Sequence, residues 1–349
     1  MINNSFFSTE ILRWFRENGR DLPWRETKDP YAIWLSEIIL QQTRIVQGWE
    51  YWERFMQTYP KVEDLAAASE DDVLKLWQGL GYYSRARNLH TAAKQIVALG
   101  DFPNTLEGIK SLKGVGDYTA AAIGSFAFDI QAAVVDGNVY RVLSRYFGID
   151  TPINSTQGKK EFAALAQSLL PASDAASYNQ GMMDFGAIQC TPQSPKCLLC
   201  PLAETCEALR CGRVEELPVK NKTVKVKTRH LSYIYIRCKS SAADGAGKSE
   251  PMVAIHRRGE GDIWQGLWEP YNVSDVKELP SFVKNPVLLA KDVKHVLTHR
   301  ILLADFYLLE TESRPRLPDD YIWIKESEIE DYGVPRLIEI MLEKINPAE

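Results

Sequence analysis

Several features are missing from this 349-residue chain, and each absence narrows its function. No apolar run approaches the ~20 consecutive residues that a membrane-spanning helix needs. The first residues lack the charged and apolar segments of a secretory signal, so we expect a cytoplasmic protein with no membrane partner. A net charge of −5 argues against a generally basic nucleic-acid binder. Residues 1–229 are nevertheless electrically balanced, so DNA binding stays possible if basic side chains gather on one face.

Internal repeats are also absent, and residues 8–210 lack the apolar–polar alternation of strands. Apolar residues instead recur at helical spacing in runs that end near Gly or Pro, the longest from Tyr31 to Tyr59. Beyond residue 229, runs such as LSYIYIRC and RILLADFYLL are rich in β-forming residues, and one helical segment follows near 335–345. The sequence predicts a multidomain protein: an all-α domain over 1–215, a basic linker over 216–229, and an α+β domain over 230–349 with a flexible hairpin tip at 239–250.

Four of the six cysteines form a cluster with the spacing C-x6-C-x2-C-x5-C, at Cys190, Cys197, Cys200 and Cys206. Without a secretory signal, such crowding indicates metal binding and not a disulfide framework. A structural zinc site usually offers two close ligand pairs, whereas only one is present here. Four thiolates in one compact loop also suit a [4Fe–4S] cluster, which the chemistry favours modestly over zinc. The other two, Cys211 and Cys238, are interpreted as ordinary thiols.

A glycine turn at Gly114-Val115-Gly116 separates two helical runs. Glycine permits positive φ and lets backbone N–H groups approach a ligand closely. The helix that follows begins with a positive dipole end that favours a phosphate, and Lys113 would add charge. The turn therefore predicts either a hairpin that grips a DNA phosphate or a plain turn in a helical bundle.

The hairpin LKGVGDYTA, the segment VDGN about twenty residues later and the cysteine loop, in this order, resemble the helix-hairpin-helix DNA glycosylases with an iron–sulfur loop. The segments WLSEIILQQT and GLGYYSRARN are most similar to the MutY family of adenine DNA glycosylases. The resemblance covers the whole chain and includes a C-terminal domain similar to MutT-type Nudix folds. It implies a monomer with a six-helix module at about 21–130, a hairpin at 112–120, and an iron–sulfur module built from the N-terminal helix and about 131–210.

Two carboxylates stand out as candidates for chemistry. Glu37 is flanked by Ile, Leu and Trp, and burial there would raise its pKa and keep it protonated, although a structural carboxylate is equally compatible with the sequence. Helical spacing would place Gln41 and Arg44 on its face. Asp136 precedes a Gly-Asn pair and a helical run, as a helix N-cap does, and the helix start would help to keep it ionised.

The resemblance implies removal of adenine that is mispaired with 8-oxoguanine or guanine in double-stranded DNA. Cleavage of the glycosidic bond needs one carboxyl group that protonates the leaving base and one ionised carboxylate that stabilises the sugar cation. The implied roles are acid for Glu37, stabiliser for Asp136, positioning of that carboxylate and of water for Asn138, and part of the adenine pocket for Arg25. Tyr118 replaces the lysine of bifunctional relatives. A phenol cannot form a Schiff base, so we predict a monofunctional enzyme that leaves an abasic site.

The resemblance also implies DNA contacts outside the chemistry. The wedge and lesion-side contacts would come from Gln41, Gln42, Thr43, Leu80 and Tyr82, and the hairpin contacts from Lys113, Gly114 and Gly116. Arg85 and Arg87 are plausible phosphate contacts. In HVLTHR, Thr298 and His299 could bind 8-oxoguanine, while Leu297 replaces an aromatic residue of the family. The segment GLWEPYNVSDVKELP lacks a Nudix box, so this domain is expected to recognise the lesion without hydrolysing nucleotides.

Two other functions fit the same sequence features. A thymine glycosylase that acts on T:G mispairs would share the cysteine loop and a residue of the Tyr118 type, but such enzymes usually lack the second domain. A non-catalytic protein that only detects damaged DNA is the other alternative, and the presence of both Glu37 and Asp136 argues against it. No motif identifies a protein partner.

Overall fold

The computed structural model describes residues 4–221, 226–239, 250–274 and 279–346. Residues 240–249 of the expected hairpin tip and residues 222–225 of the expected linker lie outside these residues. By packing, the chain separates into two units: Met1–Ala66 with Thr91–Lys222, called the helical unit, and Ala67–His90 with Thr223–Glu349, called the sheet unit. The domain limits expected from the sequence stay a prediction, because this division follows contacts alone. None of the described helices is both long and apolar enough to cross a membrane.

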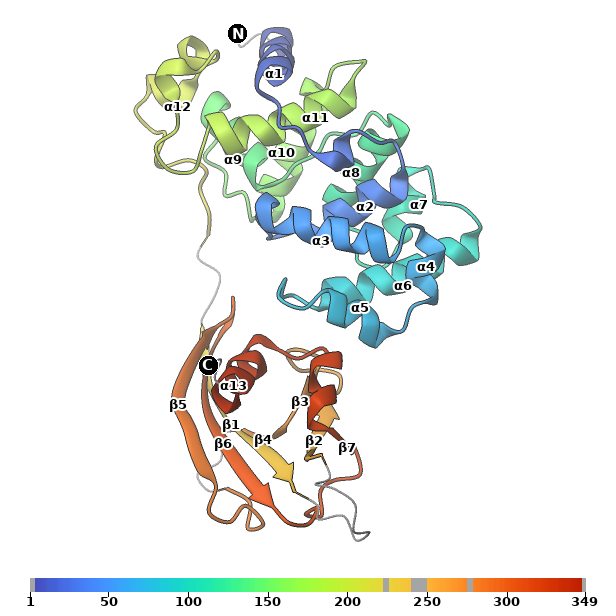
Figure 1. Ribbon diagram of the computed structural model, residues 1–349. Coiled ribbons are helices and arrows are strands. Elements are labelled where there is room, and N and C mark those ends of the chain that lie inside the picture. The colour runs from blue at the N-terminus through green and yellow to red at the C-terminus, as the bar shows by residue number, and fades with distance from the viewer. Residues whose placement is uncertain (1–3, 222–225, 240–249, 275–278, 347–349) are drawn as a thin grey trace. The chain divides into compact units, whose positions relative to one another are not determined.

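The described residues of the helical unit contain helices and loops but no strands (Figure 1). One core joins four helices through Phe7, Leu143, Phe162 and Met182, and a second core joins two others through Ile33 and Ala122. The helices are α1 (Asn4–Asn18), α2 (Pro30–Ile39), α3 (Ile45–Thr58), α4 (Val62–Ala67), α7 (Leu106–Ser111), α8 (Asp117–Phe128), α9 (Gly137–Phe147), α10 (Thr156–Leu169), α11 (Ala175–Asp184) and α12 (Glu207–Arg210). Short helical turns are η1 (Pro23–Arg25), the π-helical η2 (Phe185–Gln189), η3 (Cys197–Leu199) and η4 (Ala203–Thr205).

The single helical run predicted from Tyr31 to Tyr59 is wrong, because the chain breaks between α2 and α3. Every residue of α2 after Pro30 is buried, so the helix is a central element of the core and α3 turns back to cover it. The indole of Trp52 on α3 donates to the Ala32 carbonyl on α2 over 2.9 Å. Gln41, Gln42 and Arg44 consequently lie outside α2, in or at the end of the connecting loop, and Glu37 does not share a helix face with them.

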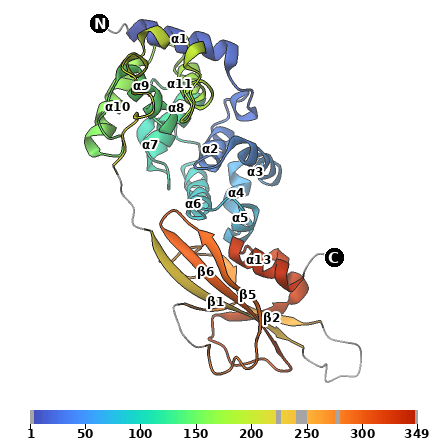
Figure 2. The same cartoon turned by 90° about the vertical axis from the view of Figure 1, so that its left-hand side faces the viewer.

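The sheet unit contains a seven-stranded mixed sheet. Its main path runs in the order β3-β2-β1-β6-β5, with β4 beside β1 and β7 beside β2. Among the described strands, β1 and β6 pair in parallel and the other pairs are antiparallel. The helix α13 (Arg336–Ile345) packs beside β5 and β6 (Figure 2). The strands are β1 (Lys227–Cys238), β2 (Met252–Arg257), β3 (Trp268–Glu269), β4 (Tyr271–Ser274), β5 (Val287–Val296), β6 (Arg300–Thr311) and β7 (Tyr321–Lys325), followed by η5 (Glu326–Asp331).

The predicted fold class is confirmed: an all-α part is followed by an α+β part. The two shortest strands, β3 and β4, were not expected from the sequence, because Pro270 separates them and each is too short to show alternation.

A helical segment of the sheet unit carries the residues expected to contact DNA near Tyr82. It comprises α5 (Glu70–Leu76) and the beginning of α6 (Ser84–Leu99). Hydrogen bonds hold it to the strands and α13: Gln78 donates to Glu339 over 2.5 Å, and Arg257 donates to Glu70 over 2.9 Å. These contacts fix the helical segment relative to the sheet.

Candidate active site and cysteine loop

Glu37 on α2 and Tyr118 in the first turn of α8 form the centre of the candidate site. The Tyr118 hydroxyl donates to Glu37 Oε2 over 2.8 Å, and Glu37 is only 6% exposed. Burial raises the pKa of Glu37 to about 7 and the charge of Asp136 adds to this rise, whereas the Tyr118 hydrogen bond and the charge of Arg25 oppose it. A large fraction of Glu37 is therefore protonated at neutral pH, as a general acid requires.

Asp136 is the N-cap of α9, which confirms the prediction from VDGN. Its Oδ1 accepts from the backbone N–H groups of Asn138 and Val139, both over 2.8 Å, and its Oδ2 accepts from the Asn138 amide over 2.7 Å. Burial raises the pKa of Asp136; the hydrogen bonds from Val139 and Asn138, together with the charge of Arg141, limit this rise but do not reverse it. The helix start thus helps to keep Asp136 ionised, as expected, but it does not reverse the effect of burial.

Asn138 is held by Arg141 on the same helix. Arg141 Nη2 donates to Asn138 Oδ1 over 2.8 Å and to the Gly186 carbonyl over 2.7 Å, while its Nε donates to the Cys190 carbonyl over 2.8 Å. Because its oxygen binds Arg141, the Asn138 amide nitrogen points to Asp136. The same arginine connects the start of α9 with the beginning of the cysteine loop.

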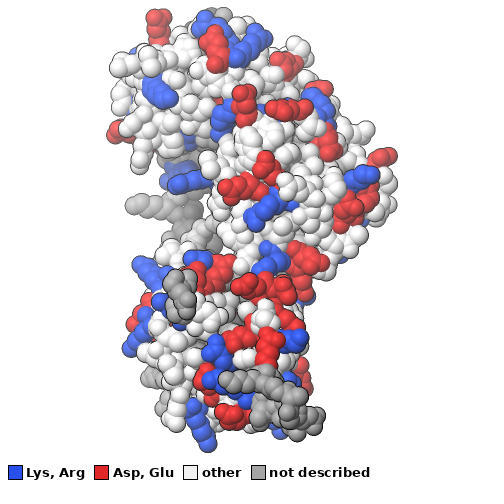
Figure 3. Space-filling view, viewed as in Figure 1, with Lys and Arg blue, Asp and Glu red and all other residues white. Residues whose placement is uncertain are grey.

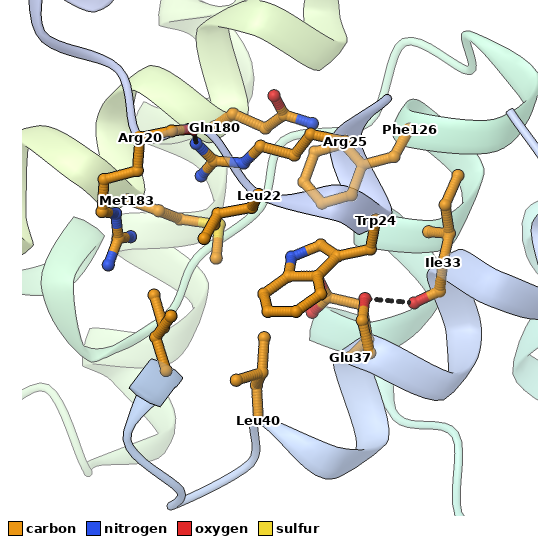
Figure 4. A pocket seen from close by; sticks show the side chains of 12 residues that line it. Arg20, Leu22, Trp24, Arg25, Ile33, Glu37, Leu40, Phe126, Gln180 and Met183 are labelled. Atoms are coloured by element: carbon orange, nitrogen blue, oxygen red, sulfur yellow. Dashed lines mark hydrogen bonds between the residues drawn. The ribbon is translucent and has the colours of Figure 1, made fainter. Parts of the chain in front are cut away.

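Glu37 faces a pocket between η1, α2, α8 and α11 (Figure 4). Its apolar wall includes Leu22, Trp24, Leu40, Phe126 and Met183, and its polar groups, besides Glu37, are Arg20, Arg25, Ser36 and Gln180. Arg25 was expected here from the sequence. Arg20 and Gln180 were missed, because neither lies in a segment that carries a recognisable motif. The combination of an aromatic wall with amide, guanidinium and carboxyl groups suits a planar nitrogen-rich ring.

The four cysteines of the loop line one small cavity together with Arg145, and none of them forms a disulfide. Burial raises the pKa of Cys200 to about 12, and the other three cysteines add to this rise. The thiolates that a metal needs are therefore formed here only when metal charge replaces the protons. No three His, Cys, Asp or Glu side chains in the described part of the chain converge tightly enough to hold a single metal ion. Four cysteines around one cavity are the ligand set that an iron–sulfur cluster takes.

Arg145 supports this loop from α9. It is 3% exposed and donates to Cys190 Sγ over 3.4 Å, to the Thr191 carbonyl over 2.7 Å and to the Pro192 carbonyl over 3.0 Å. These hydrogen bonds hold the beginning of the loop against α9.

The hairpin expected to bind a phosphate lies between α7 and α8. Gly114 has φ of +80°, where only glycine is unstrained, and Gly116 is the N-cap of α8 with open space beside its Cα. Lys113 is exposed, and its backbone N–H donates to Gln95 over 2.8 Å. The hairpin thus presents a free helix N-terminus and one cationic side chain at the surface.

The other predicted DNA contacts fall into two groups. In the loop after α2, Gln41 donates to Thr119 over 3.2 Å, Gln42 is exposed with φ of +56°, and the Thr43 hydroxyl donates to the Gln41 carbonyl over 3.4 Å. In the sheet unit, a groove is lined by the segment 79–84 and by the turn 295–300.

Within that groove Tyr82 and Thr298 are joined by a hydrogen bond of 2.5 Å between their hydroxyl oxygens. Tyr82 is 48% exposed, Leu80 is buried beneath it, and Thr298 and His299 are both exposed in the turn between β5 and β6. The structure therefore brings the Tyr82 side and the Thr298 side of the predicted lesion-reading surface together.

Arg85 and Arg87 are not free phosphate contacts, contrary to the expectation. Arg85 is 9% exposed with its guanidinium over the Trp77 ring, and Arg87 donates to the Gln265 carbonyl over 2.6 Å. On the face shown in Figure 3, basic and acidic side chains are intermingled, in keeping with the balanced charge of the sequence.

Three family models match the chain. The HhH-GPD superfamily of base excision DNA repair proteins matches residues 35–171, a NUDIX domain matches residues 247–344, and the iron–sulfur binding domain of endonuclease III matches residues 190–206. The NUDIX match confirms the expected likeness of the C-terminal part. The endonuclease III match covers all four cysteines of the loop and indicates that they bind an iron–sulfur group.

Similar proteins carry related names. The adenine DNA glycosylase of Buchnera aphidicola subsp. Acyrthosiphon pisum (strain APS) is 32% identical over 349 residues, which cover 97% of each chain. The mouse (Mus musculus) adenine DNA glycosylase is 42% identical over 226 residues, 61% of this chain and 44% of the mouse protein. Among solved structures, a thermostable thymine-DNA glycosylase is 34% identical with a TM-score of 0.56, and the match covers 60% of this chain and 97% of that one. The first match extends over both units.

Proposed function

Because this chain belongs to the adenine DNA glycosylase family, we propose that it removes adenine mispaired with 8-oxoguanine or guanine from double-stranded DNA. The observation that carries the mechanism is the proximity of two carboxyl groups, the buried Glu37 and the half-buried Asp136, since the charge of Asp136 raises the pKa of Glu37. Two carboxyl groups in unlike surroundings supply the acid and the stabiliser that glycosidic cleavage needs.

Adenine must leave the base stack before it reaches Glu37, because the pocket lies within the protein. The flipped base would pack against the indole of Trp24, which is 6% exposed. The guanidinium of Arg25 offers donors, and the amide of Gln180 offers both a donor and an acceptor, to the edge of the ring. This placement leaves the Glu37 carboxyl group as the proton source for a ring nitrogen of the base.

Glu37 would donate its proton as the glycosidic bond breaks. Protonation turns adenine into a better leaving group while the sugar develops positive charge. The two backbone N–H groups and the amide that donate to Asp136 favour its ionised form, and the resulting carboxylate would stabilise or bond to the sugar cation. The Asn138 amide, fixed by Arg141, would orient Asp136 toward the sugar and help to place the water.

Tyr118 limits the reaction to base removal. Its oxygen is engaged with Glu37 and carries no amine, so the sugar cannot form a Schiff base on this side chain. The product would be an abasic site in an uncleaved strand.

The cysteine loop would hold one [4Fe–4S] cluster through Cys190, Cys197, Cys200 and Cys206, with Arg145 against Cys190. When bound, such a cluster supplies metal charge that keeps the four sulfurs ionised and the loop folded. We propose a structural role for the cluster. Arg141 joins the backbone of the loop to Asn138 through hydrogen bonds, so a folded loop would help to keep Asn138 in place.

Recognition of the mispair would be divided between the units. The α7–α8 hairpin would bind a DNA phosphate through backbone N–H groups without reading sequence. Residues 41–43, and also Leu80 and Tyr82, would contact the DNA duplex where the flipped adenine leaves a gap. The hydroxyl of Thr298 and the imidazole of His299 would contact 8-oxoguanine from the turn between β5 and β6. The NUDIX-like domain would then serve recognition and not nucleotide hydrolysis.

Single-turnover adenine release tests this function. The wild-type chain should release adenine from A:8-oxoG and A:G duplexes, release no thymine from T:G duplexes, and leave an alkali-labile but uncut strand. Glu37→Gln should bind the A:8-oxoG duplex with no measurable release. Thymine release, or undiminished adenine release by Glu37→Gln, would overturn the proposal.

A further inference from the structure

A third carboxylate, which is fully buried and takes no part in the proposed chemistry, lies next to the candidate site. Asp184 is the last residue of α11, and its side chain has no exposure to solvent. A fully buried carboxylate is costly unless cations and hydrogen bonds compensate its charge. The partners of Asp184 therefore show what it is for.

Two arginines that line the pocket converge on Asp184. Arg25 approaches in a two-pronged arrangement, with Nη1 at 2.8 Å from Oδ2 and Nη2 at 2.9 Å from Oδ1. Arg20 donates to the same carboxylate through its backbone N–H over 3.0 Å and its Nε over 2.9 Å, and also through Nη2. Five donors thus meet one carboxylate.

These hydrogen bonds determine the charge of the group. Burial by itself would raise the pKa of Asp184, but the hydrogen bonds from Arg25 and Arg20 outweigh burial and place its pKa below the ordinary value. Asp184 is consequently an anion at any pH at which the enzyme works. The charges of Asp184 and Arg25 cancel within this pair, whose Arg25 side chain is only 12% exposed. The remaining positive charge is that of Arg20, whose side chain at 30% is more open to water.

The guanidinium of Arg25 is held by a carboxylate, a backbone carbonyl and an aromatic ring. Asp184 holds both Nη atoms, the Arg20 carbonyl accepts from Nη1 over 3.0 Å, and the Phe15 ring lies 5.6 Å from the guanidinium carbon. The two-pronged bond fixes the plane as well as the position of the group, which a single hydrogen bond cannot do. Figure 4 shows this guanidinium beside Gln180 at one end of the pocket that contains Glu37.

Arg25 also acts on the acid. Besides burial, three groups affect the pKa of Glu37: Tyr118 on α8 through a hydrogen bond, Asp136 before α9 through its charge, and Arg25 on η1 through its charge. Arg25 is the cation among them, and a positive charge favours the ionised form of a carboxyl group. An uncompensated guanidinium in a water-poor pocket would deprotonate Glu37 at neutral pH and remove the proton that the reaction needs.

We propose that Asp184 is a positioning residue of the adenine pocket, which fixes the Arg25 guanidinium for base recognition and neutralises its charge so that Glu37 stays protonated. Asp184 acts on Glu37 only through Arg25 and does not touch the substrate. This inference rests on the proposed role of Glu37 as the general acid.

The test is the pH profile of single-turnover adenine release from an A:8-oxoG duplex. Since protonated Glu37 is the active form, the rate falls as pH rises through its pKa. Asp184→Asn retains the shape of the side chain but removes its charge, so Arg25 acts as a full cation and the falling limb should move to lower pH by about half a unit or more. Arg25→Gln should move the limb to higher pH.

The double variant Arg25→Gln/Asp184→Asn tests whether Asp184 affects Glu37 through Arg25. Its limb should coincide with that of Arg25→Gln, because Arg25 is the cation whose charge acts on Glu37, whereas Arg20, the other partner of Asp184, is more open to water. Asp129→Asn is the matched control: Asp129 is exposed at 75% and paired with Lys28, so the same chemical change there should leave the profile unmoved. Iron content and the melting temperature of each variant verify folding.

The outcomes are separable from those of the proposed function. If the wild-type profile has no falling limb near neutral pH, the acid role of Glu37 fails and this inference fails with it. If the limb is present but Asp184→Asn leaves it in place while lowering the rate equally at every pH, Asp184 is only structural and the inference alone is overturned.

If Asp184→Asn does not fold but the double variant does, the neutralising role is supported, because the buried Arg25 charge is then what the fold cannot tolerate. A shift caused by Asp184→Asn in the Arg25→Gln background would contradict action through Arg25.

Discussion

Tyr118 donates its hydroxyl hydrogen to Glu37 over 2.8 Å, although the two residues are 81 positions apart and lie on different helices. The donor stabilises the ionised carboxylate, so it lowers the pKa of Glu37 against the larger effect of burial, which raises it. Tyr118 therefore sets how much acid is available at neutral pH, in addition to excluding an amine from the site.

Removal of the Tyr118 hydroxyl group should leave a larger fraction of Glu37 protonated at neutral pH. In Tyr118→Phe the carboxylate loses a donor, the pKa of Glu37 rises above about 7, and the falling limb of the rate profile moves to higher pH. A net hydrogen bond of about 0.5–1.5 kcal/mol corresponds to a shift of up to about one pH unit. Single-turnover rates across neutral and alkaline pH measure it. A limb that moves to lower pH would contradict the direction of the hydrogen bond.

Asp136→Asn should distinguish the role of Asp136 as a helix cap from its role in the reaction. Asparagine caps helices about as well as aspartate, so the melting temperature should change little. The charge that stabilises the sugar cation is lost, and we expect single-turnover adenine release to fall by about two to three orders of magnitude. Asp174→Asn is a matched control, because Asp174 caps α11 through Ser177 and its left-handed backbone (φ +64°) also suits asparagine. Equal rate losses in both variants would assign Asp136 to structure alone.

The cysteine loop should contain four irons per chain and give the purified protein a yellow-brown colour. Cys200→Ser removes a ligand, so bound iron, visible absorbance and melting temperature should all fall together, because metal binding supplies part of the folding free energy. Cys211→Ser, at an exposed thiol outside the loop, should leave all three unchanged. Bound zinc without colour in the wild type would refute the cluster.

The parts of the site that could be predicted from the sequence are those that local chemistry specifies. Asp136 followed by Gly-Asn is a capping signal within three residues, and the structure confirms it. The four cysteines occur within one short segment, so their convergence needs no knowledge of the tertiary fold. The apolar runs after residue 229 likewise show strands, because their richness in β-branched and aromatic residues lies in the sequence itself.

The parts that could not be predicted depend on distant packing. Arg25 and Asp184 are 159 positions apart, and no property of either segment reveals the two-pronged bond. The break between α2 and α3 was missed because α2 is buried on all sides and therefore shows no distinct apolar face, and the polar residues 41–44 that follow contain no Gly or Pro. Periodicity reports which face is apolar, and a helix without a polar face gives no indication of where it ends.

Thr298 should contribute to the preference for 8-oxoguanine over guanine opposite adenine. Its hydroxyl group lies 2.5 Å from that of Tyr82, so it is already held in the groove where the lesion is proposed to bind. Thr298→Val preserves the shape of the side chain but removes this group, and the ratio of single-turnover rates on A:8-oxoG and A:G duplexes should fall by up to about tenfold, the value of one hydrogen bond. Thr298→Ser retains the hydroxyl group and should preserve the ratio. A ratio that Thr298→Val leaves unchanged would remove the hydroxyl group from lesion recognition and leave His299 as the remaining polar contact of the turn.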